Sequence, residues 1–183
     1  GNSLFGEGAG ADLTTGEHNT AIGYHALFQG TTESDDNVAI GYNAMSGGFT
    51  TATVNDNVAI GSGSMAGVLA DSADANTVVG TAAAASITKG AKHTAIGYQS
   101  LATEDVGDRS TAIGYQSLYG QNSDSDNEET GNTAIGYKSG YSNVTGQNNT
   151  YMGYSAGQGV STKSHSDCVF VGSNAGSTAY TGD

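Results

Sequence analysis

The sequence of 183 residues lacks proline and tryptophan entirely and contains a single cysteine, Cys168. One cysteine cannot form a disulfide within the chain, so the class of small disulfide-stapled domains is excluded. Only five lysine and arginine residues stand against 18 aspartate and glutamate residues, which gives a net charge of -13. Nucleic-acid binding needs a basic surface, so this charge argues against a nucleic-acid partner. Because no apolar run of about 18 residues occurs, we expect no membrane insertion.

What the sequence contains instead is an internal repeat. A nonapeptide with the consensus N-[TV]-A-I-G-Y-x-[AS]-[LMG] returns ten times, at spacings of 17 to 22 residues. Such regularity indicates a solenoid, in which each repeat forms one coil and neighbouring coils share a core. We therefore expect residues 1–183 to form a single repeat domain, a fragment of a longer protein. The repeat glycines are Gly6, Gly23, Gly41, Gly61, Gly80, Gly97, Gly114, Gly136, Gly153 and Gly172.

The first half of the nonapeptide has the character of a strand, because β-branched residues take two of its five positions. Alternation places the Thr/Val and Ile positions on one face, and the Asn, Ala and Gly positions on the other. We expect the first face to fill the core and the second to allow close approach of another chain. A solvent-facing alanine row is the alternative. The alanines expected at this interface between chains are Ala21, Ala39, Ala59, Ala95, Ala112 and Ala134.

A coil of about 18 residues suits a flattened roll with two strands per coil better than a three-sided β-helix. The second strand would follow the glycine and use the tyrosine, the small residue and an apolar residue. The last three copies have Gly140, Gly157 and Gly176 at that apolar position, so the packing should change toward the C-terminal end. The expected fold is all-β, a parallel β-roll solenoid of about ten coils. Because one thin roll buries little apolar surface, we expect it to associate with further copies of the chain, and a cyclic homotrimer fits a rod of this kind.

Charge and aromatic residues divide the repeat into two parts. All but one of the 18 acidic residues lie in the connectors between nonapeptides, which predicts a water-facing part that tolerates insertions. Tyrosine follows the glycine in six copies, and we interpret this column as a packing ladder in preference to a carbohydrate-binding strip. Ser62, Thr81 and Ser173 interrupt it. The tyrosines are Tyr24, Tyr42, Tyr98, Tyr115, Tyr137 and Tyr154.

The repeat, as in the segment N-T-A-I-G-Y at residues 132–137, resembles repeats of bacteriophage tail fibres and tailspikes. It is also similar to the S-V-A-I-G head repeats of trimeric autotransporter adhesins. The resemblance covers residues 1 to about 176, and it implies a homotrimeric, left-handed parallel β-roll with the alanine row toward the threefold axis. The longer, more variable repeat and the tyrosine after the glycine favour the phage family.

The resemblance implies a structural and adhesive function, as a segment of a tail fibre in the virion that takes part in host-cell attachment. The implied partners are two further copies of the chain, other tail proteins, and a host cell-surface glycan or protein receptor. One alternative is the head domain of an adhesin on a bacterial cell surface, and another is a segment of a polysaccharide-degrading tailspike. We expect no enzymatic activity, because the acidic residues lie on exposed connectors rather than as a pair in a groove.

Few residues are candidates for metal binding. The densest group of oxygen ligands lies at residues 124–129, where Asp124, Asp126 and Glu128 are weak candidates for Ca²⁺. The segment lacks the glycine of an EF-hand loop, so a solvated acidic loop is the preferred interpretation, and no cofactor is expected. We interpret Cys168, near His165 and Asp167, as a packed small residue rather than a metal ligand or a nucleophile.

Two further repeat positions are candidates for function. His93 takes the asparagine position of its copy, where three chains of a trimer could bring three imidazoles together. Threonine recurs at the first strand position, as in Thr94 and Thr111, which is a feature of an ice-binding array. Its assignment to the core face argues against that function.

Overall fold

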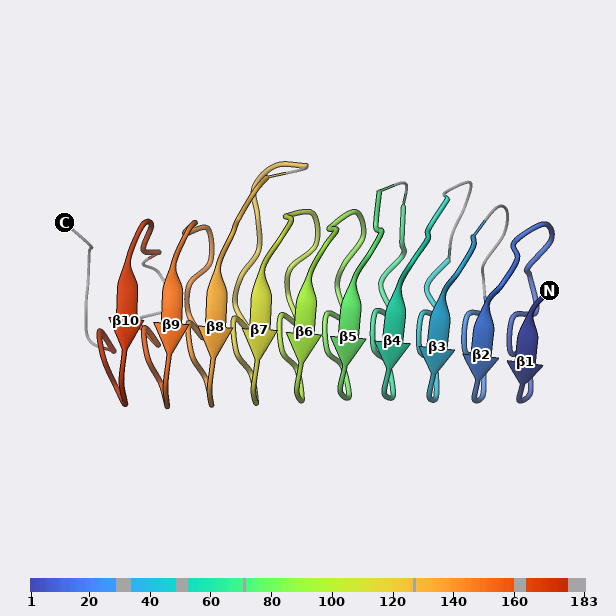
Figure 1. The fold of residues 1–183 in the computed structure, drawn as a ribbon, viewed down its shortest axis with the longest axis horizontal. Helices are drawn as coiled ribbons and strands as arrows, with labels where there is room; N and C mark the ends of the chain where they lie inside the picture. The colour runs from blue at the N-terminus through green and yellow to red at the C-terminus, as the bar shows by residue number, and fades with distance from the viewer. Residues whose placement is uncertain (29–33, 49–52, 71, 127, 160–163, 178–183) are drawn as a thin grey trace.

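The computed structural model describes residues 1–28, 34–48, 53–70, 72–126, 128–159 and 164–177. Within these residues, ten strands form one sheet in the order of the sequence, and every neighbouring pair is parallel. Figure 1 shows them side by side along a rod. The strands are β1 (Ser3–Phe5), β2 (Thr20–Ile22), β3 (Val38–Ile40), β4 (Val58–Ile60), β5 (Thr77–Val79), β6 (Thr94–Ile96), β7 (Thr111–Ile113), β8 (Thr133–Ile135), β9 (Thr150–Met152) and β10 (Val169–Val171).

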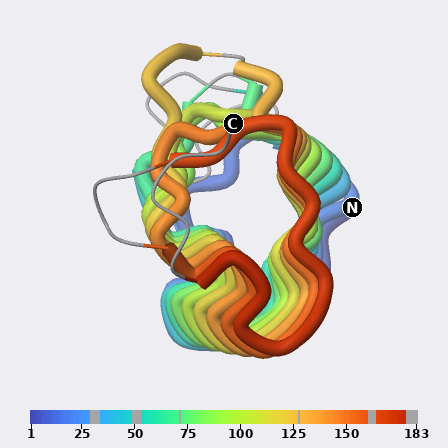
Figure 2. The backbone as a smooth tube through the Cα atoms, turned by 90° about the vertical axis from the view of Figure 1, so that its left-hand side faces the viewer, coloured from blue at the N-terminus to red at the C-terminus, as the bar shows by residue number. Residues whose placement is uncertain are grey.

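The register stacks equivalent repeat positions on one another. Thr20 pairs with Val38 and Ala21 pairs with Ala39, and the same correspondence continues from strand to strand. Viewed along the rod, the coils superimpose into one ring (Figure 2). Ten strands are joined by about nine turns of the solenoid, which at about 4.8 Å per turn gives a rod of roughly 43 Å. The prediction of an all-β parallel solenoid is confirmed.

The expected second strand of each coil is wrong for the described residues, whose strands all belong to the one sheet. After the repeat glycine the chain forms consecutive turns, and two residues per copy adopt left-handed backbone, such as His25 (φ 51°) and Leu27 (φ 50°). Their N–H groups still bond between coils. His25 N–H donates to the carbonyl of Glu7 at 2.9 Å, and Leu27 N–H donates to the carbonyl of Ala44 at 2.9 Å.

The repeat glycine ends each strand because no other residue fits there. Gly23 has a φ of 133°, a conformation that side chains other than glycine rarely adopt. A Cβ on Gly23 would lie 2.5 Å from the carbonyl oxygen of Gly41 in the next coil. Both the backbone conformation and the contact between coils therefore require glycine at this position.

The structure reverses the two faces that the sequence predicts for the strand. The central residue of each strand points into the coil, whereas the Thr/Val and Ile positions point outward, with Ile22 41% and Ile96 37% exposed. The expected interface alanines are fully buried within one chain and present no surface to another chain, so their assignment is wrong. The interior of the coil is narrow and has room for a methyl group there. These alanines are Ala21, Ala39, Ala59, Ala95, Ala112 and Ala134.

Larger apolar side chains reach the core from the turns, at the last position of the nonapeptide. Leu27, Met45 and Leu118 are fully buried there. Toward the C-terminal end the large side chain moves from the last position of the nonapeptide to the centre of the strand. Tyr151 replaces the strand alanine, and Gly157 replaces the leucine. A Cβ on Gly157 would collide with the Tyr151 ring. The expected change of packing in the last copies is therefore confirmed, and an aromatic side chain causes it.

Candidate functional site: the outer sheet face and its tyrosine column

An asparagine column inside the coil holds the strands in register. It thereby fixes the positions of the side chains on the outer face of the sheet. The Asn37 N–H donates to Asn19 Oδ1 at 2.9 Å, and the Asn57 N–H donates to Asn37 Oδ1 at 3.0 Å. The Asn37 side-chain amide also donates to the carbonyl of Val54 at 2.7 Å, which ties the connector to the strand. One side chain thus satisfies buried backbone groups in two coils, which explains the asparagine in the consensus.

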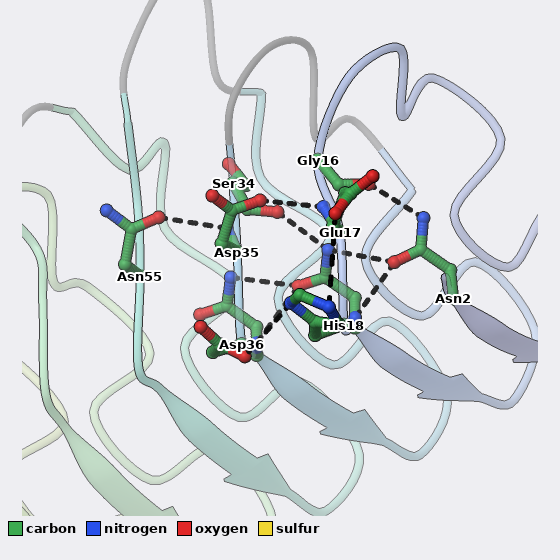
Figure 3. Close-up of polar contacts among 10 residues, drawn as sticks. Asn2, Gly16, Glu17, His18, Ser34, Asp35, Asp36 and Asn55 are labelled. Atoms are coloured by element: carbon green, nitrogen blue, oxygen red, sulfur yellow. Dashed lines mark hydrogen bonds and ion pairs between the residues drawn. The ribbon is translucent and has the colours of Figure 1, made fainter.

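A second column of side chains runs through the connectors in the opposite direction (Figure 3). The Glu17 N–H donates to Asp35 Oδ1 at 2.6 Å, the Asp35 N–H donates to Asn55 Oδ1 at 2.9 Å, and the Asn55 N–H donates to Asp74 Oδ1 at 2.7 Å. These acidic residues are at least partly exposed, as expected for connectors that face water. Asp35 and Asp74 in addition accept hydrogen bonds from the backbone of the preceding coil, a role that the sequence did not indicate.

The asparagine column is interrupted in two consecutive coils by His93 and Ser110. The Ser110 N–H donates to His93 Nδ1 at 3.1 Å, so the imidazole proton resides on Nε2, which lies 2.5 Å from the carbonyl of Gly107. Burial lowers the pKa of His93, and the facing carboxylates of Glu104 and Asp108 act in the opposite direction. His93 is only 1% exposed within one chain, which is inconsistent with its expected place on a trimer axis.

A buried carboxylate accompanies this interruption. Glu104 is fully buried and accepts hydrogen bonds from the Gly107 N–H at 2.9 Å, from the Gln121 amide at 2.7 Å and from the Ser123 hydroxyl at 3.1 Å. Reasoning from the sequence missed Glu104 and Gln121 because both lie in connectors. The available signal was the loss of asparagine in two successive copies, which requires other polar groups to complete the column.

The outer face of the sheet carries two parallel columns, one of threonine and valine and one of isoleucine. None of the ten strands contains a charged residue. The isoleucine column is flanked at its end by Met152 and Val171, which are 43% and 62% exposed. An uncharged, partly apolar strip therefore runs the length of the rod, and contiguous strips of this kind are typical of interaction surfaces.

The tyrosine column lies two residues beyond the isoleucine column and is stacked as predicted. Ring centroids of Tyr98 and Tyr115 are 5.4 Å apart, those of Tyr115 and Tyr137 are 5.1 Å apart, and those of Tyr137 and Tyr154 are 5.0 Å apart. The planes of each pair lie within 11° of parallel. Inside the stack each ring face covers its neighbour, so the column presents ring edges and hydroxyls rather than open faces.

The weak Ca²⁺ candidates are engaged separately. Asp126 pairs with Lys89, Glu128 accepts from the Gln147 amide and from the Asp124 N–H, and Asn127, within the same acidic segment, lies outside the described residues. Among the described residues, no group of three His, Cys, Asp or Glu side chains could hold a metal ion. The segment before β8 projects from the ring of coils in Figure 2.

Cys168 continues the asparagine column at the last strand. Its N–H donates to Asn149 Oδ1 at 3.0 Å, and its thiol donates to the carbonyl of Ser166 at 3.2 Å. His165 is buried with its ring edge-on to Phe170 at 5.4 Å, and Asp167 is exposed. These contacts agree with the interpretation of Cys168 as a packed small residue.

No family profile, curated protein or solved structure matches this chain. None of the described residues forms a helix that is long and apolar enough to cross a membrane.

Proposed function

We propose that the chain is a structural and adhesive segment of a phage tail fibre that takes part in host-cell attachment. The observation that carries this proposal is the continuous uncharged strip on the outer sheet face. The chain is a regular rod with an uncharged, partly apolar face on one side and charged connectors of variable length elsewhere. Such a rod is suited to a fibre shaft that displays loops. The sequence resemblance to tail-fibre repeats supports the same function.

The proposed assembly is a homotrimer in which the outer sheet faces meet, in place of the alanine columns. Ile22 and Ile96 project from this face, and a trimer would remove them from water. Burying a fully exposed apolar side chain contributes roughly 1.5–3 kcal/mol, and Ile22 and Ile96 are already more than half buried, so each would gain about 1 kcal/mol. The sum over the column along the rod is the proposed driving force for association. The chain's net charge of -13 lies outside the strands, which keeps like charges away from this contact.

Light scattering tests the assembly and cell binding tests the function. The expected mass is about three times the 18.3 kDa of one chain. Fluorescently labelled chain should bind to some members of a panel of bacterial strains and not to strains stripped of surface polysaccharide and protein. A monomeric mass would reject the trimer, and absence of binding across the panel would reject the adhesive function. Flanking sequence distinguishes a phage fibre from a bacterial adhesin.

One observation favours a second candidate function, which is ice binding. The threonine column points outward, so the objection drawn from its expected place in the core no longer holds. Five consecutive strands, β5 to β9, present threonine at the same register, about 4.8 Å apart along the rod. A flat array of hydroxyls and methyls at one repeat distance can order water.

The two candidate functions require opposite states of the outer face, covered in one case and exposed to water in the other. A trimer covers the threonine column, whereas ice binding needs the column open in a monomer. Thermal hysteresis of a monomeric sample, lost in Thr111→Lys, would support ice binding over the fibre. A trimeric sample without hysteresis would reject it.

A further inference from the structure

The tyrosine column has a gap that is two coils wide. Tyr24 and Tyr42 stack at 5.4 Å on one side of it, and the stack that begins with Tyr98 lies on the other. Between them, the tyrosine position holds Ser62 in one coil and Thr81 in the next. With three coil spacings between Tyr42 and Tyr98, their ring planes lie roughly 14 Å apart.

The gap exposes aromatic faces that the stack covers elsewhere. Tyr42 is 57% exposed and Tyr98 is 46% exposed, whereas Tyr115 and Tyr137, inside the stack, are 42% and 40% exposed. Tyr154, at the other open end, is 56% exposed. The rings that border the gap therefore each present one face toward it.

The floor of the gap consists of the smallest side chains in the column. Gly63 follows Ser62, and Ala82 follows Thr81. A Cβ added to Gly63 would meet no atom within 4 Å, so the space above it is open. The hydroxyls of Ser62 and Thr81 are exposed and make no hydrogen bond to another described residue.

The lack of charged residues around the gap favours an uncharged ligand. The nonapeptides of the four coils concerned contain no charged residue. The charges closest to the gap along the column lie two coils away on either side. Glu7 takes the tyrosine position two coils before Tyr42, and the ammonium of Lys138, two coils beyond Tyr98, lies over the rings of Tyr137 and Tyr141. The gap thus offers aromatic faces and hydroxyls without an ion. The face of an aromatic ring carries partial negative charge and attracts the C–H groups on the flat side of a pyranose, while hydroxyls pair with the sugar's own hydroxyls.

We infer that the gap between Tyr42 and Tyr98 is a binding site for a neutral saccharide, with a sugar ring stacked on each open tyrosine face and hydroxyls bound by Ser62 and Thr81. The inference rests on the proposed attachment function and specifies its ligand. A single shallow site binds weakly, and several copies on one fibre that bind together raise the apparent affinity.

The test uses the chain's own repeat to close the gap. The double variant Ser62→Tyr/Thr81→Tyr restores the residue that six other copies carry, so it should fold and melt no lower than the wild type. Ser173→Tyr makes the same change at the far end of the column and is the matched control. The probes are neutral oligomers of glucose, galactose and N-acetylglucosamine, together with polygalacturonate and indole. Binding is followed by NMR shifts of the Gly63 and Ala82 amides.

We expect a neutral oligosaccharide to shift both amides in the wild type and in Ser173→Tyr, with affinity reduced about tenfold or more in the double variant. If the double variant does not fold, Tyr98→Leu, which removes one wall, should show the same loss. Binding that neither variant changes, binding of indole or polygalacturonate alone, or binding of no probe would overturn the inference. Sugar binding by a monomeric chain would uphold the site and reject the trimer, whereas a trimer that binds no sugar would reject the site alone.

Discussion

Two substitutions to aspartate at adjacent positions of β7 test which face of the strand fills the coil. Ala112 is fully buried, and the residues paired with it on the neighbouring strands are Ala95 and Ala134, which are also fully buried. A carboxylate at position 112 therefore meets methyl groups and no hydrogen-bond donor side chain in the paired positions. Ile113, the next residue, points outward and is only partly buried. We expect Ala112→Asp to unfold the coil and Ile113→Asp to leave it folded.

The two changes in the free energy of unfolding differ enough to be separated. Burying a polar group without a partner costs roughly 2–7 kcal/mol, and an unpaired charge costs more. Since domains of this kind are stable by about 5–15 kcal/mol, Ala112→Asp should remove most or all of the stability. Ile113→Asp loses part of the burial of one side chain and some strand propensity, together about 1–2 kcal/mol.

Urea unfolding followed by far-ultraviolet circular dichroism measures both effects, and light scattering on the same samples reports association. In a trimer joined by the outer faces, Ile113→Asp should lower the mass while the spectrum stays that of the folded strand-rich chain. Measuring at several protein concentrations separates the loss of association from the loss of folding, because association makes stability concentration-dependent. Equal or greater destabilisation by Ile113→Asp than by Ala112→Asp would refute the orientation of the strands.

Three other predictions follow from the columns that hold the coils together. The pKa of His93 is lowered in the folded chain, so the stability from its neutral form is complete above pH 6.5 and is lost as the pH falls through the lowered value. His93→Asn should therefore weaken the acid sensitivity of the midpoint of urea unfolding. Gly23→Ala should cost at least about 1–3 kcal/mol, seen as a lower melting temperature, since alanine is strained at a φ of 133°. Asn57→Leu should cost about 1–3 kcal/mol in urea unfolding by leaving buried backbone groups unpaired, and an unchanged midpoint would show that the column contributes no stability.

The repeat made the solenoid predictable, because identical positions at nearly constant spacing can all be satisfied when coils stack in register. The glycine was predictable for the same reason, and Gly41 and Gly61 show the expected positive φ. The turns after the glycine were not predictable. Residues such as Leu118 adopt left-handed backbone, with a φ of 46°, against their own preference. Packing of the buried side chain and hydrogen bonds between coils outweigh that preference, and neither is visible in the local sequence.

The candidate site was predictable only in part. The position after the glycine identified the tyrosine column and its interruptions at Ser62 and Thr81, but the meaning of the gap depends on exposure and on the open space above Gly63. The buried Glu104 could not be recognised as structural, because a carboxylate in a connector is ordinarily solvated. Its place inside the coil depends on donors from Gly107, Gln121 and Ser123 that come together only after the coils stack.

The assignment of the strand faces was wrong because the alternation of side chains defines two faces but does not show which of them points into the core. β-branched residues fill the core when two sheets lie far enough apart to hold them, as expected for a two-strand roll. Here one sheet closes against turns, and the interior holds a small strand residue with a large turn residue, as in Ala112 and Leu118, or the reverse, as in Tyr151 and Gly157. Where both residues are small, as in Ala134 and Gly140, the side chains of Leu118 and Tyr151 from the neighbouring coils approach Gly140. The total volume available in the interior, rather than the apolar character of either face, is what the narrow coil constrains. The same constraint forces isoleucine outward, and it is therefore the size of the interior that creates the exposed strip along the rod.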